Sequence, residues 1–274
     1  MSHRSGQAVS EPSGQVLSQL SGQLAERSWC ELSGRAPTVL LPLGSCEQHG
    51  PHLPLDTDIA VAEEIARRAV AELAPQHDVL MAPAQSYAAS GEHEGFPGTV
   101  SIGHEALELL LVEIGRSACR WARRLLVVNG HGGNLVGLRR AVARLREEGR
   151  DVAWWHCAVP GADGHAGRCE TSLMSAVRPD SVHVERARAG RTEPTPELMP
   201  ELLRGGVQAV SPNGVLGDPA GSSAREGRAW LSEAAGRLAA AVANWRVEAG
   251  ILASATRERE LRAGQTRDQE GELG

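Results

Sequence analysis

The chain has 274 residues, of which 41% are hydrophobic and 23% are charged, and its formal net charge is −6. A chain of this length and composition can bury the core of one α/β domain. The acidic excess and an aromatic content of 3% argue against proteins that bind nucleic acid or membrane surfaces, which need basic patches or stacking side chains.

Cysteine usage and hydropathy indicate the compartment. The five cysteines are odd in number and far apart, and none forms a Cys-x-x-Cys pair. This pattern is not a disulfide framework and favours a reducing environment. No apolar run approaches the roughly 20 residues that span a membrane, and the N-terminus lacks the apolar segment of a secretory signal. We therefore expect a cytoplasmic protein.

The chain is predicted to form one domain over residues 15–255. A polar, disordered leader is expected at 1–14 and a charged tail at 256–274. No internal repeat and no linker long enough to separate two domains is present in the sequence.

Strands and helices are predicted to alternate along the first 155 residues. Apolar residues at helical spacing indicate a docking helix from Val16 to Trp29. Short apolar runs, typical of buried parallel strands, are each followed by an amphipathic helix. The predicted strands cover residues 38–42, 78–82, 125–128 and 152–155, and the helices between and after them cover 59–73, 104–122 and 135–148. This alternation favours an α/β fold with a parallel sheet and helices on both faces.

The pattern changes after residue 158. A polar loop at 163–172 leads into a short helix that Pro179 ends. Residues 188–222 are rich in Pro and Gly and are expected to cross the surface without regular structure. A long amphipathic helix is predicted from Glu226 to Ala253.

The loop after the first predicted strand is crowded with carboxylates and imidazoles. It contains Glu47, His49, His52, Asp56 and Asp58. Carboxylates this close together repel one another unless a bound cation offsets their charge. Carboxylate oxygen and imidazole nitrogen are donor atoms that zinc, iron and manganese accept. The loop therefore indicates a divalent-metal site and a metal-dependent hydrolase.

Polar residues also follow the third and fourth predicted strands. His131 lies in Asn129-Gly-His-Gly-Gly-Asn134, and His165 and Glu170 follow the fourth strand. Loops at the carboxyl ends of parallel strands emerge at one edge of the sheet, where open α/β folds bind ligands. We expect these residues to converge with Glu47, His49 and Asp58 in one pocket.

Each of these residues has a simpler interpretation. Glu47 and His49 can be solvated loop residues, and Thr57 or Asp58 can cap the helix that follows. Gly-His-Gly-Gly can bind phosphate through backbone amides, although Lys is absent and the usual Gly spacing is not met. The simpler interpretation is preferred for three histidines, which are expected to support loops or face solvent: His52, His93 and His104.

Other functional classes are less well supported. Cys46 and Cys169 adjoin acidic residues, which raise a thiol pKa and make a Cys nucleophile unattractive. A non-catalytic peptide-binding scaffold and a nucleotide-binding module remain as alternatives, to be separated by metal and nucleotide binding.

Three motifs together resemble the creatininase (creatinine amidohydrolase) family. They are Glu47-Gln-His-Gly-Pro-His-Leu-Pro-Leu-Asp-Thr-Asp58, Asn129-Gly-His-Gly-Gly-Asn134 and His165-Ala-Gly-Arg-Cys-Glu-Thr-Ser172. The resemblance is close over about 38–178 and weaker to about 253. It implies a three-layer α/β/α fold with a mostly parallel central sheet, two divalent metals and a homo-oligomer.

The resemblance also implies the ligands of each metal. Glu47, Asp58 and His131 would hold one ion, while His49, Asp58 and a further carboxylate would hold the second, with Asp58 bridging. Creatininase has a Glu ligand two residues after the His of its Asn-Gly-His motif, where this chain has Gly133. Glu170 is the expected replacement. Zinc, iron(II) and manganese all accept this donor set.

Three segments resemble the subgroup of the family that acts in mycofactocin biosynthesis. They are Ser90–Thr99, residues 165–174 and Ser211–Pro219. The implied activity is release of the C-terminal Val-Tyr dipeptide from a modified precursor peptide; the alternative is hydrolysis of a small cyclic amide or a formamide. His165 is the expected proton shuttle, because imidazole titrates near neutral pH, although it can instead orient Glu170.

Overall fold

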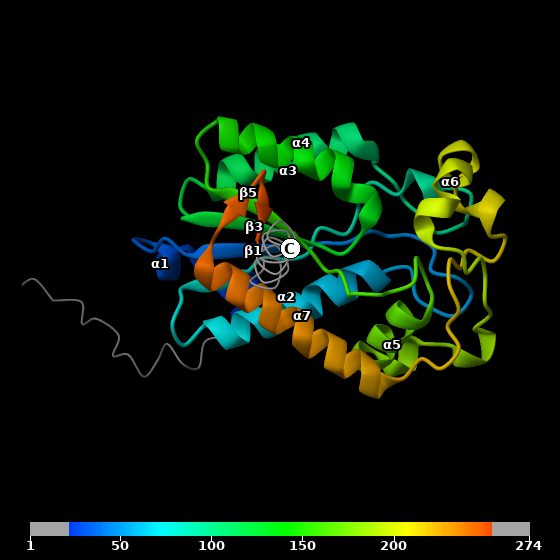
Figure 1. Ribbon diagram of the computed structural model, residues 1–274. Coiled ribbons are helices and arrows are strands. Elements are labelled where there is room, and N and C mark those ends of the chain that lie inside the picture. The colour runs from blue at the N-terminus through cyan, green and yellow to red at the C-terminus, as the bar shows by residue number, and fades with distance from the viewer. Residues whose placement is uncertain (1–21, 254–274) are drawn as a thin grey trace, which may run out of the picture.

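A six-stranded, mostly parallel sheet lies between two layers of helices in the computed structural model, which describes residues 22–253 (Figure 1). The strand order is β2-β1-β3-β4-β6-β5, and only β5 runs antiparallel to its neighbour. The strands are β1 (Thr38–Leu43), β2 (Val79–Met81), β3 (Arg124–Asn129), β4 (Val152–His156), β5 (Val247–Glu248) and β6 (Ile251–Leu252). The α/β fold with a mostly parallel sheet is confirmed.

Seven α-helices accompany the sheet in the described part of the chain. They are α1 (Trp29–Leu32), α2 (Thr57–Leu73), α3 (Gly103–Ala118), α4 (Leu135–Glu147), α5 (Arg168–Val177), α6 (Thr195–Val210) and α7 (Ala224–Asn244). Helices α3 and α4 cover one face of the sheet, and α2 and α7 cover the other (Figure 1). Helices α5 and α6 lie beyond the ends of the strands, at the right of Figure 1.

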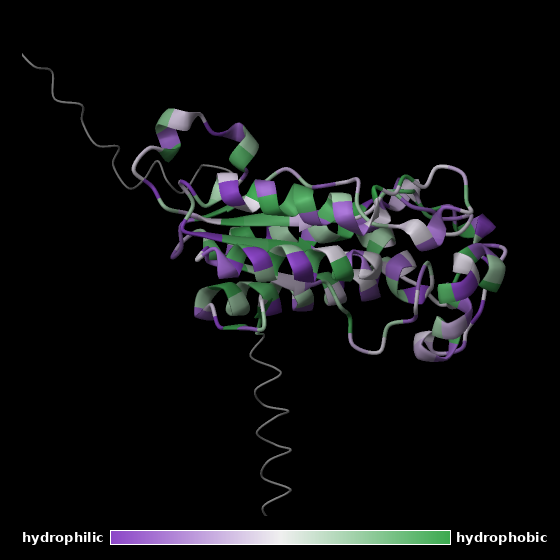
Figure 2. Ribbon diagram, turned by 90° about the horizontal axis from the view of Figure 1, so that it is seen from above, coloured by the Kyte–Doolittle hydropathy of each residue, from purple (hydrophilic) through white to green (hydrophobic). Residues whose placement is uncertain are grey.

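Side-chain alternation along the strands builds a core on each face. Along β1, Val39 and Leu41 pack in the cluster that includes Leu107 of α3, whereas Leu40 packs in the cluster that includes Ile65 of α2. Successive side chains of a strand point to opposite faces, so a strand covered on both sides must be apolar throughout. All six residues of β1 are buried, and the strands form the apolar centre of the molecule in Figure 2.

The N-terminal helix predicted from Val16 is wrong where the structure describes it. Its first residues, the predicted leader and the whole of the predicted tail lie outside the described range. Leu24–Glu26 form only a 3-10 turn, and α1 begins anew at Trp29. The Glu31 carboxylate accepts from the Ser28 backbone N–H at 2.7 Å, so a local cap starts a helix here.

The segment predicted to lack regular structure contains α6. Its Pro196 lies in the first turn, where backbone N–H groups have no acceptor within the helix, so the N–H that proline lacks costs no hydrogen bond. The helix kinks at Gly206, whose φ is +67°. Leu198 and Val207 are buried in a small apolar cluster that holds the helix to the rest of the domain.

The last predicted helix is too long. Trp245 adopts a left-handed conformation with φ of +42° and ends α7, and the chain then forms the β5–β6 hairpin. Leu252 is therefore buried in the sheet rather than on a helix. Among residues 22–253, no helix combines the length and the apolar character that crossing a membrane requires.

Candidate metal centre

The site begins where β1 and β3 end side by side. Leu43 is paired with Asn129 in the sheet, and the Gly130 N–H donates to the Leu43 carbonyl at 2.8 Å. The Asn134 amide donates to the Gly44 carbonyl at 3.0 Å, and its oxygen accepts from the Ala89 N–H at 3.0 Å. The Asn-Gly-His-Gly-Gly-Asn motif thus ties the loop after β1 to Ala89, the residue directly before the Ser90–Thr99 segment.

Asp58 enters the site from the first turn of α2. A Cβ at Gly130 would lie 2.7 Å from the Asp58 carbonyl, so only a glycine lets α2 approach this closely. The N-cap position is Asp56, not Thr57 or Asp58, and the capping role expected for those residues is wrong. Asp56 instead accepts from Arg178 Nη2 at 2.6 Å, and the Asp58 carboxylate is free to face the histidines.

The structure brings together all five residues expected to bind metal. Within the described residues, three sets of side chains have ligand atoms close enough to share an ion: Glu47 with Asp58 and His131, His49 with Asp58 and Glu170, and Glu47 with His49 and His165. Asp58 belongs to the first two sets, as a bridging ligand would.

The first set is tightly packed and buried. His131 Nε2 lies 3.1 Å from Glu47 Oε2, and His131 Nδ1 lies 3.4 Å from Asp58 Oδ2. Three atoms of this set are buried without a hydrogen bond: Glu47 Oε1, Asp58 Oδ2 and His131 Nε2. Native structures rarely leave such atoms unpartnered. The first set therefore fits a divalent cation.

The second set joins α2 to α5. His49 Nε2 lies 3.2 Å from Asp58 Oδ1 and 3.7 Å from Glu170 Oε2. Glu170 lies in the first turn of α5 and not in the loop before it, because α5 already begins at Arg168. The Glu170 carboxylate also accepts from the Ala166 N–H at 2.6 Å, and Ala166 has a left-handed φ of +52°. The backbone turn after His165 thus points Glu170 toward His49.

His49 is oriented so that one ring nitrogen faces the carboxylates. His49 Nδ1 donates to the Glu47 carbonyl at 3.1 Å, which leaves Nε2 toward Asp58. Such a hydrogen bond on the far nitrogen is the usual way a protein orients a metal-binding imidazole.

Charge coupling sets the protonation of the metal-free centre. Burial alone lowers the pKa of His49, but Asp58, Glu170 and Glu47 raise it to about 10. Burial likewise opposes the charge of His131, and Glu47, Glu92 and Asp58 raise its pKa well above the usual value. Burial and the neighbouring Glu47 raise the pKa of Asp58 to about 6.

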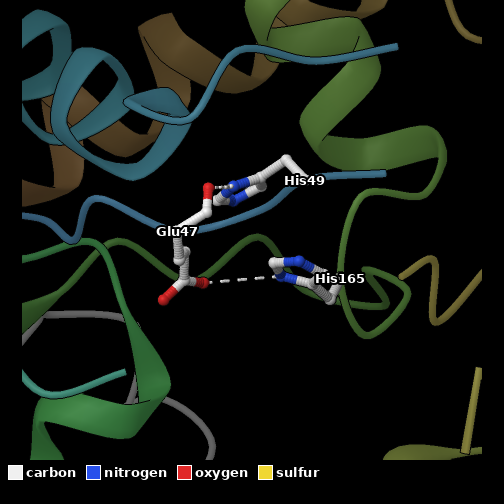
Figure 3. Close-up of side chains that lie close together, drawn as sticks. All are labelled: Glu47, His49 and His165. Atoms are coloured by element: carbon white, nitrogen blue, oxygen red, sulfur yellow. Dashed lines mark hydrogen bonds and ion pairs between the residues drawn. The ribbon is translucent and has the colours of Figure 1, made fainter. Parts of the chain in front are cut away.

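His165 lies against one of the same carboxylates, Glu47. Its Nδ1 lies 3.8 Å from Glu47 Oε1 (Figure 3), and its Nε2–H donates to the Gln48 carbonyl at 2.8 Å. Its backbone pairs with Leu216 through two hydrogen bonds of 2.9 and 2.8 Å. Ser211–Pro219, one of the segments that carried the resemblance, therefore holds His165 in place.

His93 supports the loop after β1 as expected, because its Nδ1 accepts from Gln48 Nε2 at 2.9 Å, but it also lies at the centre, which was not expected. His93 is 3% exposed, and its Nε2 lies 3.4 Å from Glu47 Oε1. Burial and the neighbouring His165 lower the pKa of His93. His52 does support its loop, since it is buried and bonds the Thr171 hydroxyl at 2.9 Å. The sequence signal for His93 was the Ser90–Thr99 segment, which was noted but not connected to the site.

A cavity of about 680 Å³ opens over the centre. Its polar floor includes Asp58, His131, His165 and Glu170. The opposite wall is apolar and comes largely from α6, through Met199, Leu202, Leu203 and Val207. Helix α6 therefore forms much of the apolar wall of the cavity.

Comparison with known proteins identifies the family. The family model for creatininase, described as creatinine amidohydrolase, matches residues 25–242. The mycofactocin precursor peptide peptidase of Mycobacterium tuberculosis (strain CDC 1551 / Oshkosh) is 52% identical over 221 residues, which cover 78% of this chain and 88% of that protein. The creatinine amidohydrolase of Pseudomonas putida is 31% identical over 197 residues, covering 60% and 74%.

Solved structures of creatininases share the fold. A creatinine amidohydrolase (creatininase) structure superposes with a TM-score of 0.65 at 24% identity, covering 82% of this chain and 97% of that one. A creatininase described by its manganese superposes with a TM-score of 0.66 at 23% identity, covering 81% and 98%.

Metal binding is expected to release protons. With a pKa of about 10, His49 is protonated in the metal-free protein at pH 8, and the neighbouring carboxylates also favour the protonated form of His131, whose pKa they raise. A metal needs the neutral imidazole of both residues. We expect about two protons released per chain and an affinity that rises with pH between 7 and 9. Calorimetric titration of the metal-stripped protein in buffers of different ionisation enthalpy measures this number. An affinity that is independent of pH over this range would contradict it.

Proposed function

The chain belongs to the creatininase family, and we propose that it is a divalent-metal-dependent peptidase that releases the C-terminal Val-Tyr dipeptide from the modified mycofactocin precursor peptide. One observation carries this proposal: overlapping sets of metal-ligand atoms form the floor of a cavity with an apolar wall. The relatives that share about half of their residues with this chain are named for the same peptide substrate.

The dimensions of the cavity favour a peptide over a small cyclic amide. Its volume of about 680 Å³ lies in the range that encloses a drug-sized ligand, which is much larger than creatinine. The α6 wall offers Met199 and Leu202 to the apolar and aromatic side chains that a peptide end such as Val-Tyr presents. Burial of such side chains contributes roughly 25 cal/mol per Å².

The proposed roles follow from the contacts. Glu47, Asp58 and His131 would hold one metal, and His49, Asp58 and Glu170 the other. Metals bound there would supply Lewis-acid chemistry and an activated water, whose pKa falls from about 16 toward about 7. The sharing of Asp58 would keep the two ions adjacent.

His165 would move the proton that the leaving nitrogen requires. Burial and the nearby His49 lower the pKa of His165, so its imidazole is neutral near pH 7. Its Nε2–H is engaged with the Gln48 carbonyl, so Nδ1 is the atom that can accept a proton and pass it on. Hydrolysis of an amide needs this transfer because an amide nitrogen leaves poorly as an anion.

The proposal also includes the identity of the metals and the formation of a homo-oligomer. The oxygen and nitrogen donors suit zinc, iron(II) or manganese, and creatininase structures are described as Mn and as Zn-Zn types. A homo-oligomer is consistent with large apolar side chains at the surface, where Trp29 is 78% and Leu203 is 80% exposed. Elemental analysis and light scattering on one preparation examine both.

The substrate is tested directly with metal-replete protein. We expect mass spectrometry to detect Val-Tyr and the shortened peptide when the modified precursor peptide is supplied. The metal-stripped protein is the matched control and should be inactive. Hydrolysis of creatinine or a formamide without release of the dipeptide would favour the alternative amidohydrolase, and binding without hydrolysis would favour a scaffold.

Two substitutions separate metal binding from proton transfer. Asp58→Asn should abolish metal loading and hydrolysis, because it weakens both proposed sites at once. His165→Ala should retain the metals and slow turnover by roughly 100-fold or more. Metal content and kcat measured on the same samples distinguish the two effects. A metal-loaded and fully active Asp58→Asn protein would rule out the bridging role.

A further inference from the structure

Two histidines, His93 and His165, lie side by side against the same oxygen of the metal centre. Their ring centroids are 4.4 Å apart, and both residues line the cavity although they are almost fully buried. His93 Nε2 lies 3.4 Å and His165 Nδ1 lies 3.8 Å from Glu47 Oε1. Distance alone therefore does not decide which of the two imidazoles can accept a proton during hydrolysis.

The side-chain amide of Gln48, which adjoins both histidines, is oriented by the backbone. Its Oε1 accepts from the Gly50 N–H at 2.9 Å, and its Nε2 donates to the Gly214 carbonyl at 3.0 Å. The reverse orientation would place two donors and two acceptors face to face. A Cβ at Gly214, whose φ is +79°, would lie 1.9 Å from Gln48 Oε1, so only a glycine leaves room for the amide.

The oriented amide decides where His93 carries its proton. Gln48 Nε2 has two hydrogens, of which one goes to the Gly214 carbonyl and the other to His93 Nδ1 at 2.9 Å. His93 Nδ1 is then an acceptor, so the imidazole is neutral and its proton lies on Nε2, the nitrogen that faces Glu47. His93 therefore presents a hydrogen-bond donor to the centre.

The main chain of Gln48 gives His165 the opposite character. His165 Nε2 lies 2.8 Å from the Gln48 carbonyl, which can only accept, so His165 carries its proton on Nε2. The approach of Gln48 Nε2 to the same ring nitrogen, at 3.1 Å, is then a contact between two donors. The unprotonated Nδ1 of His165 faces Glu47. His165 thus presents an acceptor where His93 presents a donor.

We propose that Gln48 is a positioning residue that gives the two histidines opposite roles. Of the two, only His165 can accept a proton, whereas His93 directs its Nε2–H toward the carboxylate of Glu47 and supports the charge of this metal ligand. The role of His165 rests on the proposed hydrolysis, but the placement of the two protons does not. Groups that orient a metal ligand from outside typically change affinity or activity by 10- to 100-fold when they are removed.

The placement of the protons is tested by NMR on the full chain, labelled with 15N-histidine and supplied with zinc. Spectra of His93→Phe and His165→Phe assign the two rings. In the unaltered chain we expect the proton on Nε2 of both rings. A proton on His93 Nδ1, or on His165 Nδ1 in place of Nε2, would overturn the inference.

A substitution shows whether Gln48 controls the ring of His93. In Gln48→Met the Nδ1 resonance of His93 should shift, because that nitrogen loses its donor. Gln85→Met is the matched control, since the Gln85 amide donates to the Tyr87 carbonyl and does not line the cavity, and it should leave the resonance in place. An unmoved resonance in Gln48→Met would contradict the proposed role.

Kinetics test the consequence for turnover. Gln48→Met should lower kcat on the modified precursor peptide by about 10- to 100-fold without changing KM or zinc content. Because its amide acts through His93, the same substitution should cost little more in a His93→Phe background. Losses that multiply in the double variant, or full activity of Gln48→Met, would refute the inference. If the unaltered chain releases no dipeptide, the proposed substrate fails while the NMR result still decides the inference.

Discussion

The structure depends on holding several carboxylates together where water cannot reach them. Glu47 is fully buried and Asp58 nearly so, and the two share His131 between them. An isolated buried charge costs several kcal/mol, which is comparable with the whole stability of a domain, about 5–15 kcal/mol. The positive charge must therefore come from the histidines or from metal. In the metal-free protein, the raised pKa values of His49 and His131 indicate that the protonated imidazoles supply this positive charge.

The backbone around the centre allows these charged side chains to come close together. Glycines at 130 and 133 allow α2 and Glu92 to come closer than any side chain would permit. Asn134 bonds two loops that lie 45 and 90 residues away in the sequence. Helix α6 lines the cavity, and its kink at Gly206 lies against the backbone of Glu92. The segments that position the candidate metal ligands therefore also shape the cavity through which a substrate would reach them.

Two kinds of residue meet at this edge of the sheet. The loops after β1 and β3 and the first turn of α2 bring the buried side chains that could hold a cation: Glu47, His49, His131 and Asp58. Glu170, His165 and Glu92 come from α5, the turn before it and the 90–99 segment, and they line the cavity. Asp58 and His131 also line the cavity, whereas Glu47 and His49 are not part of its lining. A peptide with apolar side chains would meet the α6 wall within this cavity.

The sequence by itself determined the alternation of strands and helices, the mostly parallel sheet and the residue types of the metal centre. These follow from periodicity and from the chemistry of carboxylates and imidazoles, which are local properties. Only the tertiary structure decided that Glu170 lies in the first turn of α5, that 195–210 is a helix despite its prolines, and that Glu92 and His93 lie at the centre. Helix α6 is stabilised by burial of Leu198 and Val207, and His93 by its contact with Glu47 across 46 positions. Such contacts are absent from any local pattern, because they exist only once distant segments pack together.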